Sequence, residues 1–264
     1  SGRIRPSTVL TYLFEQDRID AAIVSEYDEN FKPVPKIIYD KKDLLKSAGT
    51  RYSISSNILP LKDFNKISQE IMNKKDILNI EDLSIAFVGT PCQCRAIRKM
   101  QHLSISPIYS IRFVIGLFCF ENFDYDKLFE IIEKETKLVP ANVLKAQIKK
   151  NFFVTSRENK VFEVDIKKLD EAVRDHCHEC DEFTGRFSDF SVGASGAPEG
   201  YSIIIIRTNE GQNLINSLLS EGFIDKYNIP AKEISEWKTK KINWFRKMTS
   251  LKTKKGKLGE KNEK

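Results

Sequence analysis

Four of the five cysteines are placed where they suit an iron–sulfur cluster or a zinc ion. Cys92 follows the Gly-Thr-Pro turn at residues 89–91, and Cys119 follows an apolar stretch, while Cys177 and Cys180 form a C-x-x-C pair. Cysteine thiolates ligate both iron–sulfur clusters and zinc. The types and spacing of these four residues therefore predict a metal centre.

Zinc and unmetallated thiols are the alternatives to a cluster. A C-x-x-C pair suits a zinc knuckle, and His176 and His178 flank it as further ligands. Structural zinc usually draws its ligands from two compact pairs, whereas Cys92 and Cys119 each stand alone in the sequence. The spacing favours an iron–sulfur cluster and leaves the other two interpretations open.

Cys94 is predicted to be a small buried hydrophobe rather than a ligand. It lies two residues after Cys92 on a predicted helix, and side chains at that spacing do not face together. The odd cysteine count and the lack of a secretory segment at Ser1 argue against a disulfide framework. We expect reduced thiols in a cytoplasmic protein.

Two strand-to-helix junctions are predicted to carry the first two of these cysteines. Residues 83–88 form an apolar, β-rich run before a helical stretch at 92–101, and a second strand at 112–118 precedes Cys119 and a helix at about 125–137. Successive junctions of this kind end at the same edge of a sheet. We therefore expect Cys92 and Cys119 to lie together, beside helix N-termini that favour thiolates and anions.

The fold class is predicted to be mixed α/β, with an antiparallel section near residues 143–166. Short polar turns separate the three β-rich runs of that section. Two strands and a closing helix are expected at 187–192, 201–207 and 210–221, after a loop at 175–186. Earlier elements are expected at 8–16, 21–25, 36–39 and 61–79, with Asp40 as the cap of a helix reaching Ser47.

Composition predicts a large folded unit followed by a basic tail. The 264 residues, 41% of them hydrophobic, suffice for one large domain or two intimate ones, which we assign to residues 1–230. The net charge is +6, but residues 238–264 carry +9, so the rest of the chain is near −3. The first residue is Ser1 rather than Met, which leaves a missing upstream segment open.

Residues 231–264 are predicted to be a basic, partly disordered tail. Trp244 and Phe245 are interleaved with lysines, as in an amphipathic helix that docks on a partner or an anionic surface. The last dozen residues, however, have the composition of a frayed, solvated terminus. Basic charge alone does not specify nucleic acid, so no specific nucleic-acid partner is expected.

The sequence lacks the residues that a hydrolytic active site, a phosphate-binding loop or a membrane span would require. Three histidines, two of them beside the C-x-x-C pair, leave little for a Ser-His-Asp or Cys-His arrangement. The glycine-bearing loops at 48–50 and 193–196 contain neither a G-x-G-x-x-G nor a Walker sequence. No run approaches the length of a membrane span, and the apolar run at 201–206 ends at Arg207.

The ordered combination of these motifs resembles the coenzyme F420 hydrogenase/dehydrogenase beta-subunit family. The resemblance runs from about residue 9 to residue 228. It is carried by Gly-Thr-Pro-Cys92-Gln with Ala-Ile-Arg-Lys-Met, Ile-Gly-Leu-Phe-Cys119-Phe-Glu-Asn-Phe, Cys177-His-Glu-Cys180-Asp, Ser188-Asp-Phe-Ser-Val-Gly193 and Ile206-Arg-Thr-Asn-Glu-Gly211.

The resemblance implies a flavoprotein that holds one 4Fe-4S cluster beside FAD, or FMN, and exchanges hydride with coenzyme F420. It implies that the cluster ligands are Cys92, Cys119, Cys177 and Cys180. It implies flavin contacts from Gly49, Thr50, Arg51, Tyr52, Gly89, Thr90, Asn122, Asp189 and Gly193. A hydrogenase or dehydrogenase subunit, or ferredoxin, is the implied electron partner.

The start of the chain departs from the family. Its members open with a Gly-Gly-containing stretch, whereas Arg3, Arg5 and Pro6 make this region bulkier, which implies an altered flavin or coenzyme pocket. Three alternatives remain: a reductase that uses the same cofactors with another acceptor, a catalytically degenerate assembly subunit, and a zinc-stabilised binding module.

Overall fold

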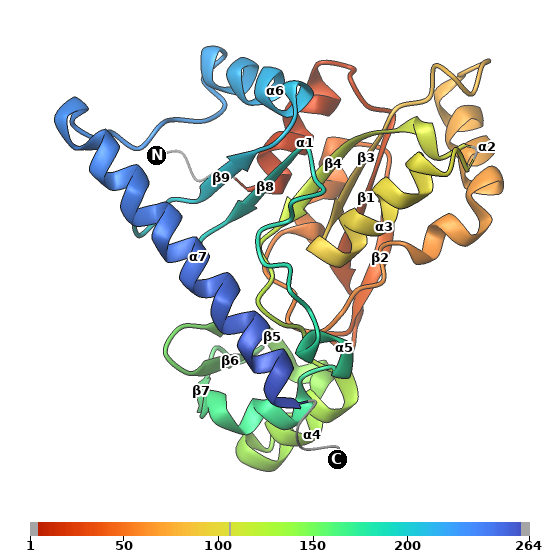
Figure 1. Cartoon of the computed structure of the whole chain (residues 1–264). Coiled ribbons are helices and arrows are strands. Elements are labelled where there is room, and N and C mark those ends of the chain that lie inside the picture. The colour runs from red at the N-terminus through yellow and green to blue at the C-terminus, as the bar shows by residue number, and fades with distance from the viewer. Residues whose placement is uncertain (1–4, 106, 260–264) are drawn as a thin grey trace.

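A six-stranded sheet and a smaller three-stranded sheet form the framework of the chain (Figure 1). The computed structural model describes residues 5–105 and 107–259, with side chains through Lys254. Its strands are β1 (Ala21–Tyr27), β2 (Pro33–Ile38), β3 (Ile85–Gly89), β4 (Ile111–Leu117), β5 (Val143–Ile148), β6 (Phe152–Ser156), β7 (Val161–Val164), β8 (Phe190–Gly193) and β9 (Ile203–Ile206). Its α-helices are α1 (Pro6–Glu15), α2 (Phe64–Lys75), α3 (Pro91–His102), α4 (Tyr125–Thr136), α5 (Asp175–His178), α6 (Asn209–Ser220) and α7 (Ile234–Gly259).

The large sheet has the strand order β2-β1-β3-β4-β8-β9. Its four inner strands are parallel to their neighbours, and the two edge strands run antiparallel. Every residue of β3 is buried, as expected for a strand covered on both faces. The mixed α/β class predicted from the sequence is confirmed.

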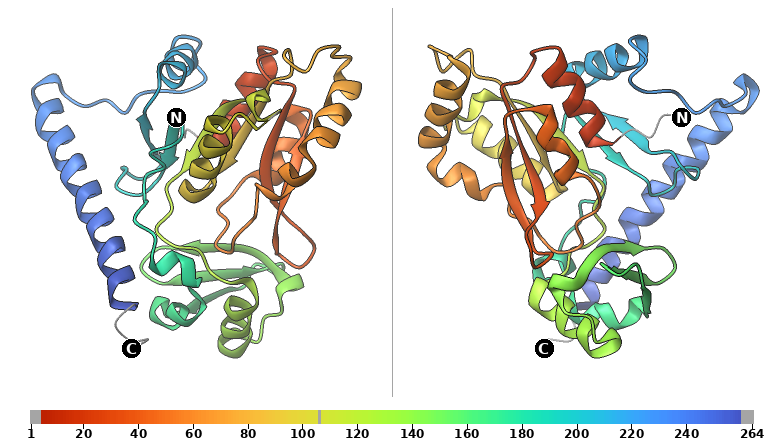
Figure 2. Two further views of the ribbon diagram at one scale, coloured as in Figure 1. Left: turned by 45° about the vertical axis from the view of Figure 1, so that its right-hand side comes forward. Right: turned by 180° about the vertical axis from the view of Figure 1, so that it is seen from behind.

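Helices cover both faces of the large sheet. On one face, Leu10 of α1 and Leu214 of α6 belong to one apolar cluster. On the other face, Ile71 of α2 and Ile97 of α3 belong to a second cluster. Figure 2 shows the sheet between these two helical layers.

The small sheet is a separate antiparallel unit with the order β5-β6-β7. It packs with α4 and the 3₁₀ helix Ile166–Ala172 around a third apolar cluster that contains Phe129, Phe152 and Leu169. Asp124 starts α4 by accepting hydrogen bonds from the backbone N–H groups of its first turn. The antiparallel section predicted near residues 143–166 is therefore confirmed.

Some predicted elements differ in extent or type. The helix expected at 61–79 is α2, which ends at Lys75 because Asp76 adopts a left-handed conformation. Asp40 does cap a helix that reaches Ser47, but this helix is 3₁₀. The loop expected at 175–186 contains the single turn α5, and the strand expected from residue 187 begins at Phe190.

The C-terminal stretch was given two interpretations, an amphipathic helix and a frayed, solvated terminus. The structure has a helix, α7, over Ile234–Gly259, while residues 260–264 lie outside the described residues. Half-buried side chains recur at Lys241, Trp244 and Met248, a helical spacing that lets one face of α7 pack on the body. The domain boundary near residue 230 stays a prediction. Within the described residues, none of the helices combines the length and the apolar character needed to cross a membrane.

Candidate functional site

Cys92 and Cys119 lie at the same edge of the large sheet, as predicted. β3 and β4 are parallel neighbours in which Gly89 pairs with Gly116, so their carboxyl ends coincide. Cys92 is in the first turn of α3, directly after β3, and Cys119 is two residues beyond β4. The Thr90 hydroxyl oxygen lies 3.2 Å from the Cys92 Sγ.

The C-x-x-C segment is hydrogen-bonded to the loop that carries Cys119. The backbone N–H of Cys119 donates to the carbonyl of Phe183 over 3.0 Å, three residues after Cys180. The backbone N–H of Arg174 donates to the Asn122 carbonyl over 3.1 Å, three residues before Cys177. The two segments are thus joined on both sides of the C-x-x-C pair.

The thiols are close enough to affect one another's ionisation. The pKa of Cys119 is raised to about 12, chiefly by burial and to a smaller extent by the thiols of Cys177 and Cys92, against the opposing effects of Lys252 and Asn122. Burial also raises the pKa of Cys177, and Cys180 adds to that rise. Thiolates at these positions need a compensating cation, which a bound metal supplies.

The cysteines do not form a closed site for a single ion. No group of three or more His, Cys, Asp or Glu side chains among the described residues is arranged to hold one metal ion. A 4Fe-4S cluster makes a different demand, because each of its four cysteines binds its own iron at a corner of the cube. The donor set of four cysteines is the one that such a cluster takes.

Asn122 lies between two of the thiols. Its side-chain Nδ2 donates to the Cys119 Sγ over 3.8 Å, and its backbone hydrogen bond lowers the pKa of Cys177. Its Oδ1 is buried and has no hydrogen-bond partner among the described residues. A buried acceptor without a partner calls for an explanation such as a bound group. Asn122 therefore fits the predicted role beside the cofactors, which stays a prediction.

The predicted flavin loop at residues 49–52 is held by Arg51. Its guanidinium donates to the carbonyls of Ala48, Gly49 and Ser25 and lies over the Tyr27 ring at 4.4 Å. Burial lowers the pKa of Arg51. The Tyr27 hydroxyl donates to the carbonyl of Thr50 over 2.8 Å. Arg51 thus fixes the loop from inside, with Gly49 at a φ of 101° that favours glycine.

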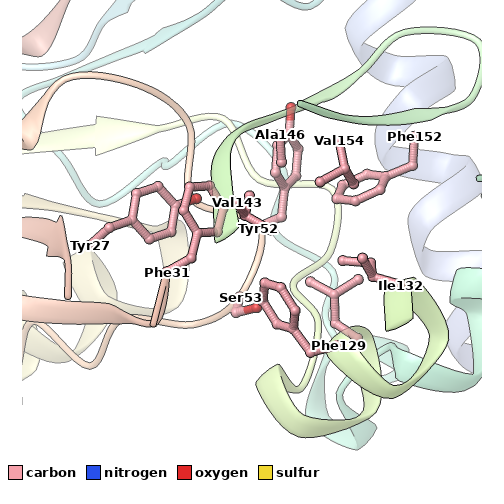
Figure 3. Close-up of a pocket in the computed structure, with 11 residues that line it drawn as sticks. Tyr27, Phe31, Tyr52, Ser53, Phe129, Ile132, Val143, Ala146, Phe152 and Val154 are labelled. Atoms are coloured by element: carbon pink, nitrogen blue, oxygen red, sulfur yellow. The ribbon is translucent and has the colours of Figure 1, made fainter. Parts of the chain in front are cut away.

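The side chain of Tyr52 packs in the small unit. Its ring packs edge to face on Phe152, and its hydroxyl accepts from the Ile148 N–H over 2.7 Å. Figure 3 shows the apolar pocket that Tyr52 lines with Tyr27, Phe31 and residues of the small unit. The volume of this pocket is about 10 Å³, the space of about one water molecule, so the pocket cannot hold a flavin.

The Tyr52 backbone, by contrast, does reach the cysteine loop. Its carbonyl accepts from the Phe123 N–H over 2.9 Å, and Phe123 also bridges to Ser53 and Val173. This arrangement brings residues 52–53, 122–123 and 173–174 side by side. The predicted flavin loop and Asn122 are therefore neighbours.

Gly89 and Thr90 form the turn before Cys92. A Cβ at Gly89 would lie 2.5 Å from the Phe87 ring, so the turn requires glycine for packing. The adjacent Gln93 was not predicted as a site residue. Its Nε2 donates to the Ser55 carbonyl over 2.6 Å, and its Oε1 is buried without a partner among the described residues.

Asp189 and Gly193 have packing roles in the structure. The Asp189 carboxylate accepts from the Arg98 Nη2 over 2.6 Å, the Thr208 hydroxyl over 2.9 Å and the Val114 N–H over 2.8 Å. A Cβ at Gly193 would lie 2.1 Å from the Phe118 ring. The prediction that these two residues contact a flavin stays a prediction, and the residues that would carry it are already engaged.

Two further points concern the predicted site. Residues 1–4, which hold most of the departure from the Gly-Gly opening, lie outside the described residues, and Pro6 starts α1.

Lys252 was not predicted at all, because it falls in the stretch expected to be partly disordered. Its Nζ is buried beside Cys119. The spacing of the apolar residues in α7 was the sequence pattern that indicated a packed helix there.

Comparison with known proteins relates most of the chain to one family. Residues 7–62 match the model of the N-terminal part of the coenzyme F420 hydrogenase/dehydrogenase beta subunit, and residues 82–232 match that of its C-terminal part. The coenzyme F420 hydrogenase subunit beta of Methanococcus voltae is 31% identical over 221 residues, which cover 83% of this chain and 75% of that protein.

Two other similar proteins extend the comparison. The coenzyme F420-dependent sulfite reductase of Methanocaldococcus jannaschii is 32% identical over 253 residues, covering 90% of this chain but only 37% of that protein. A chain from the F420-reducing [NiFe] hydrogenase complex of Methanosarcina barkeri superposes with a TM-score of 0.79 at 28% identity. That superposition covers 96% of this chain and 82% of the other.

Proposed function

The chain belongs to the coenzyme F420 hydrogenase/dehydrogenase beta-subunit family, and from this premise we propose that it is an oxidoreductase subunit that passes electrons between a partner redox protein and coenzyme F420. The observation that carries the proposal is the convergence of the loops around Cys92, Cys119 and the C-x-x-C pair at one sheet edge. The resemblance predicted from the motifs is confirmed at the level of the family.

The proposed cofactors are one 4Fe-4S cluster and one FAD. When bound, the cluster supplies single-electron transfer and the flavin converts electrons into a hydride for coenzyme F420. Cys92, Cys119, Cys177 and Cys180 would hold the cluster. The proposed flavin contacts are Gly49, Thr50, Arg51, Tyr52, Gly89, Thr90, Asn122, Asp189 and Gly193.

The residues around the thiols prepare the site in three ways. Asn122 directs its side-chain N–H toward one thiol and its backbone N–H toward another, which favours thiolates over thiols. Arg51 keeps the 49–52 loop in place through carbonyl hydrogen bonds. Phe118 and Phe183 pack on each other beside Cys119 and place apolar rings on that side.

The proposed electron partner is another subunit of a redox complex. The relatives from Methanococcus voltae and Methanosarcina barkeri are both named as subunits of coenzyme F420 hydrogenase. A chain with a single set of cluster ligands needs an outside donor or acceptor. A hydrogenase or dehydrogenase subunit, or ferredoxin, would supply it.

Anaerobic purification followed by a coenzyme F420 assay tests the proposal. We expect about four irons per chain, a flavin spectrum, and bleaching of oxidised coenzyme F420 when reduced ferredoxin or dithionite supplies electrons. Cofactors with no reaction on coenzyme F420 would instead support another acceptor or an assembly role. Zinc without flavin would overturn the proposal.

A further inference from the structure

Helix α7 lies outside the stretch that matches the family models. The matched residues end at 232, and α7 begins at Ile234. Figure 1 and both views of Figure 2 show α7 as a long helix along one side of the molecule, and its C-terminal part contacts α5. Because α5 contains Cys177, α7 reaches the cysteine site.

One face of α7 packs on the two loops beside the cysteines and on the loop after β8. Phe245 contacts Phe118, the residue before Cys119, with ring centroids 5.4 Å apart. Both Trp244 and Phe245 contact Phe183, which follows the C-x-x-C pair. The same helix meets the loop after β8, where Trp244 covers Gly196 and Lys241 donates to its carbonyl.

Lys252 ends this packed face with a buried charge. The residue is only 3% exposed, and its Nζ donates to the carbonyls of Cys119 and Glu182, each over 2.8 Å. One carbonyl belongs to a cysteine loop and the other follows the C-x-x-C pair, so a single ammonium ties both segments together. No ion pair among the described residues includes Lys252.

A buried ammonium without a carboxylate is costly unless negative charge lies close to it. Glu182 does not supply that charge as an ion-pair partner, because its carboxylate pairs with Arg186 over 2.9 Å within its own loop. The ammonium does lie at the cysteine site, since one of the two carbonyls that it binds is that of Cys119 itself. Four thiolates on a cluster would supply the missing negative charge.

We propose that α7 completes the cysteine site and that Lys252 is a positioning residue, which joins the two cysteine segments and stabilises the reduced, more negative state of the group that the thiolates bind. This inference rests on the proposed function. Adding an electron makes the bound group more negative, so a nearby fixed positive charge raises its reduction potential.

Lys252→Met and Lys252→Arg test the proposal beside Lys254→Met, a matched control that removes an exposed lysine from the same helix. Each full-length protein is purified anaerobically, its iron is counted, and its potential is titrated with dithionite and followed by electron paramagnetic resonance. We expect Lys252→Met to lower the equilibrium constant of the one-electron reduction about tenfold, which lowers the reduction potential by about 59 mV. Lys252→Arg should recover most of the potential, and Lys254→Met should match the original chain.

The remaining outcomes are also decisive. Loss of iron from Lys252→Met, with a retained far-ultraviolet circular dichroism spectrum and with iron kept by Lys252→Arg, would support the proposal. An unchanged potential in Lys252→Met, or equal effects of Lys252→Met and Lys254→Met, would overturn it. If the original chain binds no iron, the proposed function fails first, so the two failures are distinguishable.

Discussion

Two cysteines that are two residues apart illustrate how position decides chemistry. Cys92 is exposed in the first turn of α3, whereas Cys94 is fully buried in the apolar cluster of that helix. The Cys94 thiol is enclosed by that cluster and donates to the Gly89 carbonyl over 3.5 Å, so it lies inside the apolar core and is not available as a ligand. The sequence-based prediction that Cys94 is a buried hydrophobe is confirmed by its burial.

Cys92→Ala and Cys94→Ala therefore form a matched pair. We expect Cys92→Ala to lose most of its bound iron, because a proposed ligand is removed at the surface of the protein. Cys94→Ala should keep its iron and lose about 1 kcal/mol of stability from a small cavity. Iron analysis after anaerobic purification, with urea unfolding of both variants, checks this. Equal iron in the two variants would exclude Cys92 as a ligand.

Asp189 shows how one side chain can fit two roles. The resemblance places it at a flavin, while the structure gives its carboxylate three donors from β4, α3 and the start of α6. Gly211 adds to this, because a Cβ there would lie 2.4 Å from the Asp189 carbonyl oxygen. These contacts alone explain why an aspartate is needed at position 189 for the packing of the three elements.

Asp189→Ala should destabilise the protein by about 3 kcal/mol, because it leaves Arg98 and the Val114 N–H without their buried partner. Asp181→Ala is the control, since Asp181 is in an exposed pair with Arg186 and should cost at most about 1 kcal/mol. Chemical unfolding measures both changes. A stable Asp189→Ala protein that fails to bind flavin would restore the flavin role.

At the scale of the elements, the sequence predicted the strands and helices that carry the cysteines better than it predicted the C-terminal helix. The apolar run before Gly89 and the one before Cys119 have no competing interpretation, so β3 and β4 lie within two residues of their predicted bounds. Their parallel pairing followed from the two strand-to-helix junctions.

The C-terminal helix was harder to predict, for a physical reason. Its stability depends on contacts that are distant in the sequence, such as Phe245 with Phe118 and Lys252 with the Cys119 carbonyl. The interleaved aromatic residues allowed an amphipathic helix, but the lysine-rich composition of the last dozen residues favoured a solvated terminus. The same reason explains why Lys252 and the orphaned Gln93 Oε1 were missed at the candidate site.

Trp244→Ala tests whether α7 is held by its packed face. Removing this ring takes away contacts with Phe183 and Gly196, so we expect the free energy of local opening of α7 to fall by about 1–2 kcal/mol. Arg246→Ala on the exposed side is the control. Hydrogen exchange across residues 234–254 reports the difference, and equal exchange in the two variants would contradict the packing.

At the scale of the whole molecule, the cysteines come from both sides of the small sheet in the sequence. Cys92 and Cys119 precede β5, and the C-x-x-C pair follows β7 and its 3₁₀ helix. A group bound by all four thiolates would therefore link the edge of the large sheet to the segment that leaves the small unit. Phe123, which bridges Ser53 and Val173, makes the same connection through the backbone.

Removal of iron should loosen this connection. A ligand that binds the folded chain at a thousandfold its Kd stabilises it by about 4 kcal/mol. In a chain of this size each kcal/mol shifts the Tm by about 2–4 °C, so the iron-loaded protein should melt at least about 8 °C above the iron-free protein. Anaerobic calorimetry of both forms measures the shift.

Two comparisons make the iron-removal experiment specific. Cys92→Ala, treated in the same way, should show little change in Tm, because it lacks one proposed ligand. Hydrogen exchange should slow on iron loading at residues 118–123 and 174–186 but not in α2. Helix α2 packs in the second apolar cluster, and none of its described residues shares a hydrogen bond with either cysteine loop. Equal Tm values with and without iron, or protection spread evenly over α2 and the cysteine loops, would contradict a cofactor that joins the two units through the four thiolates.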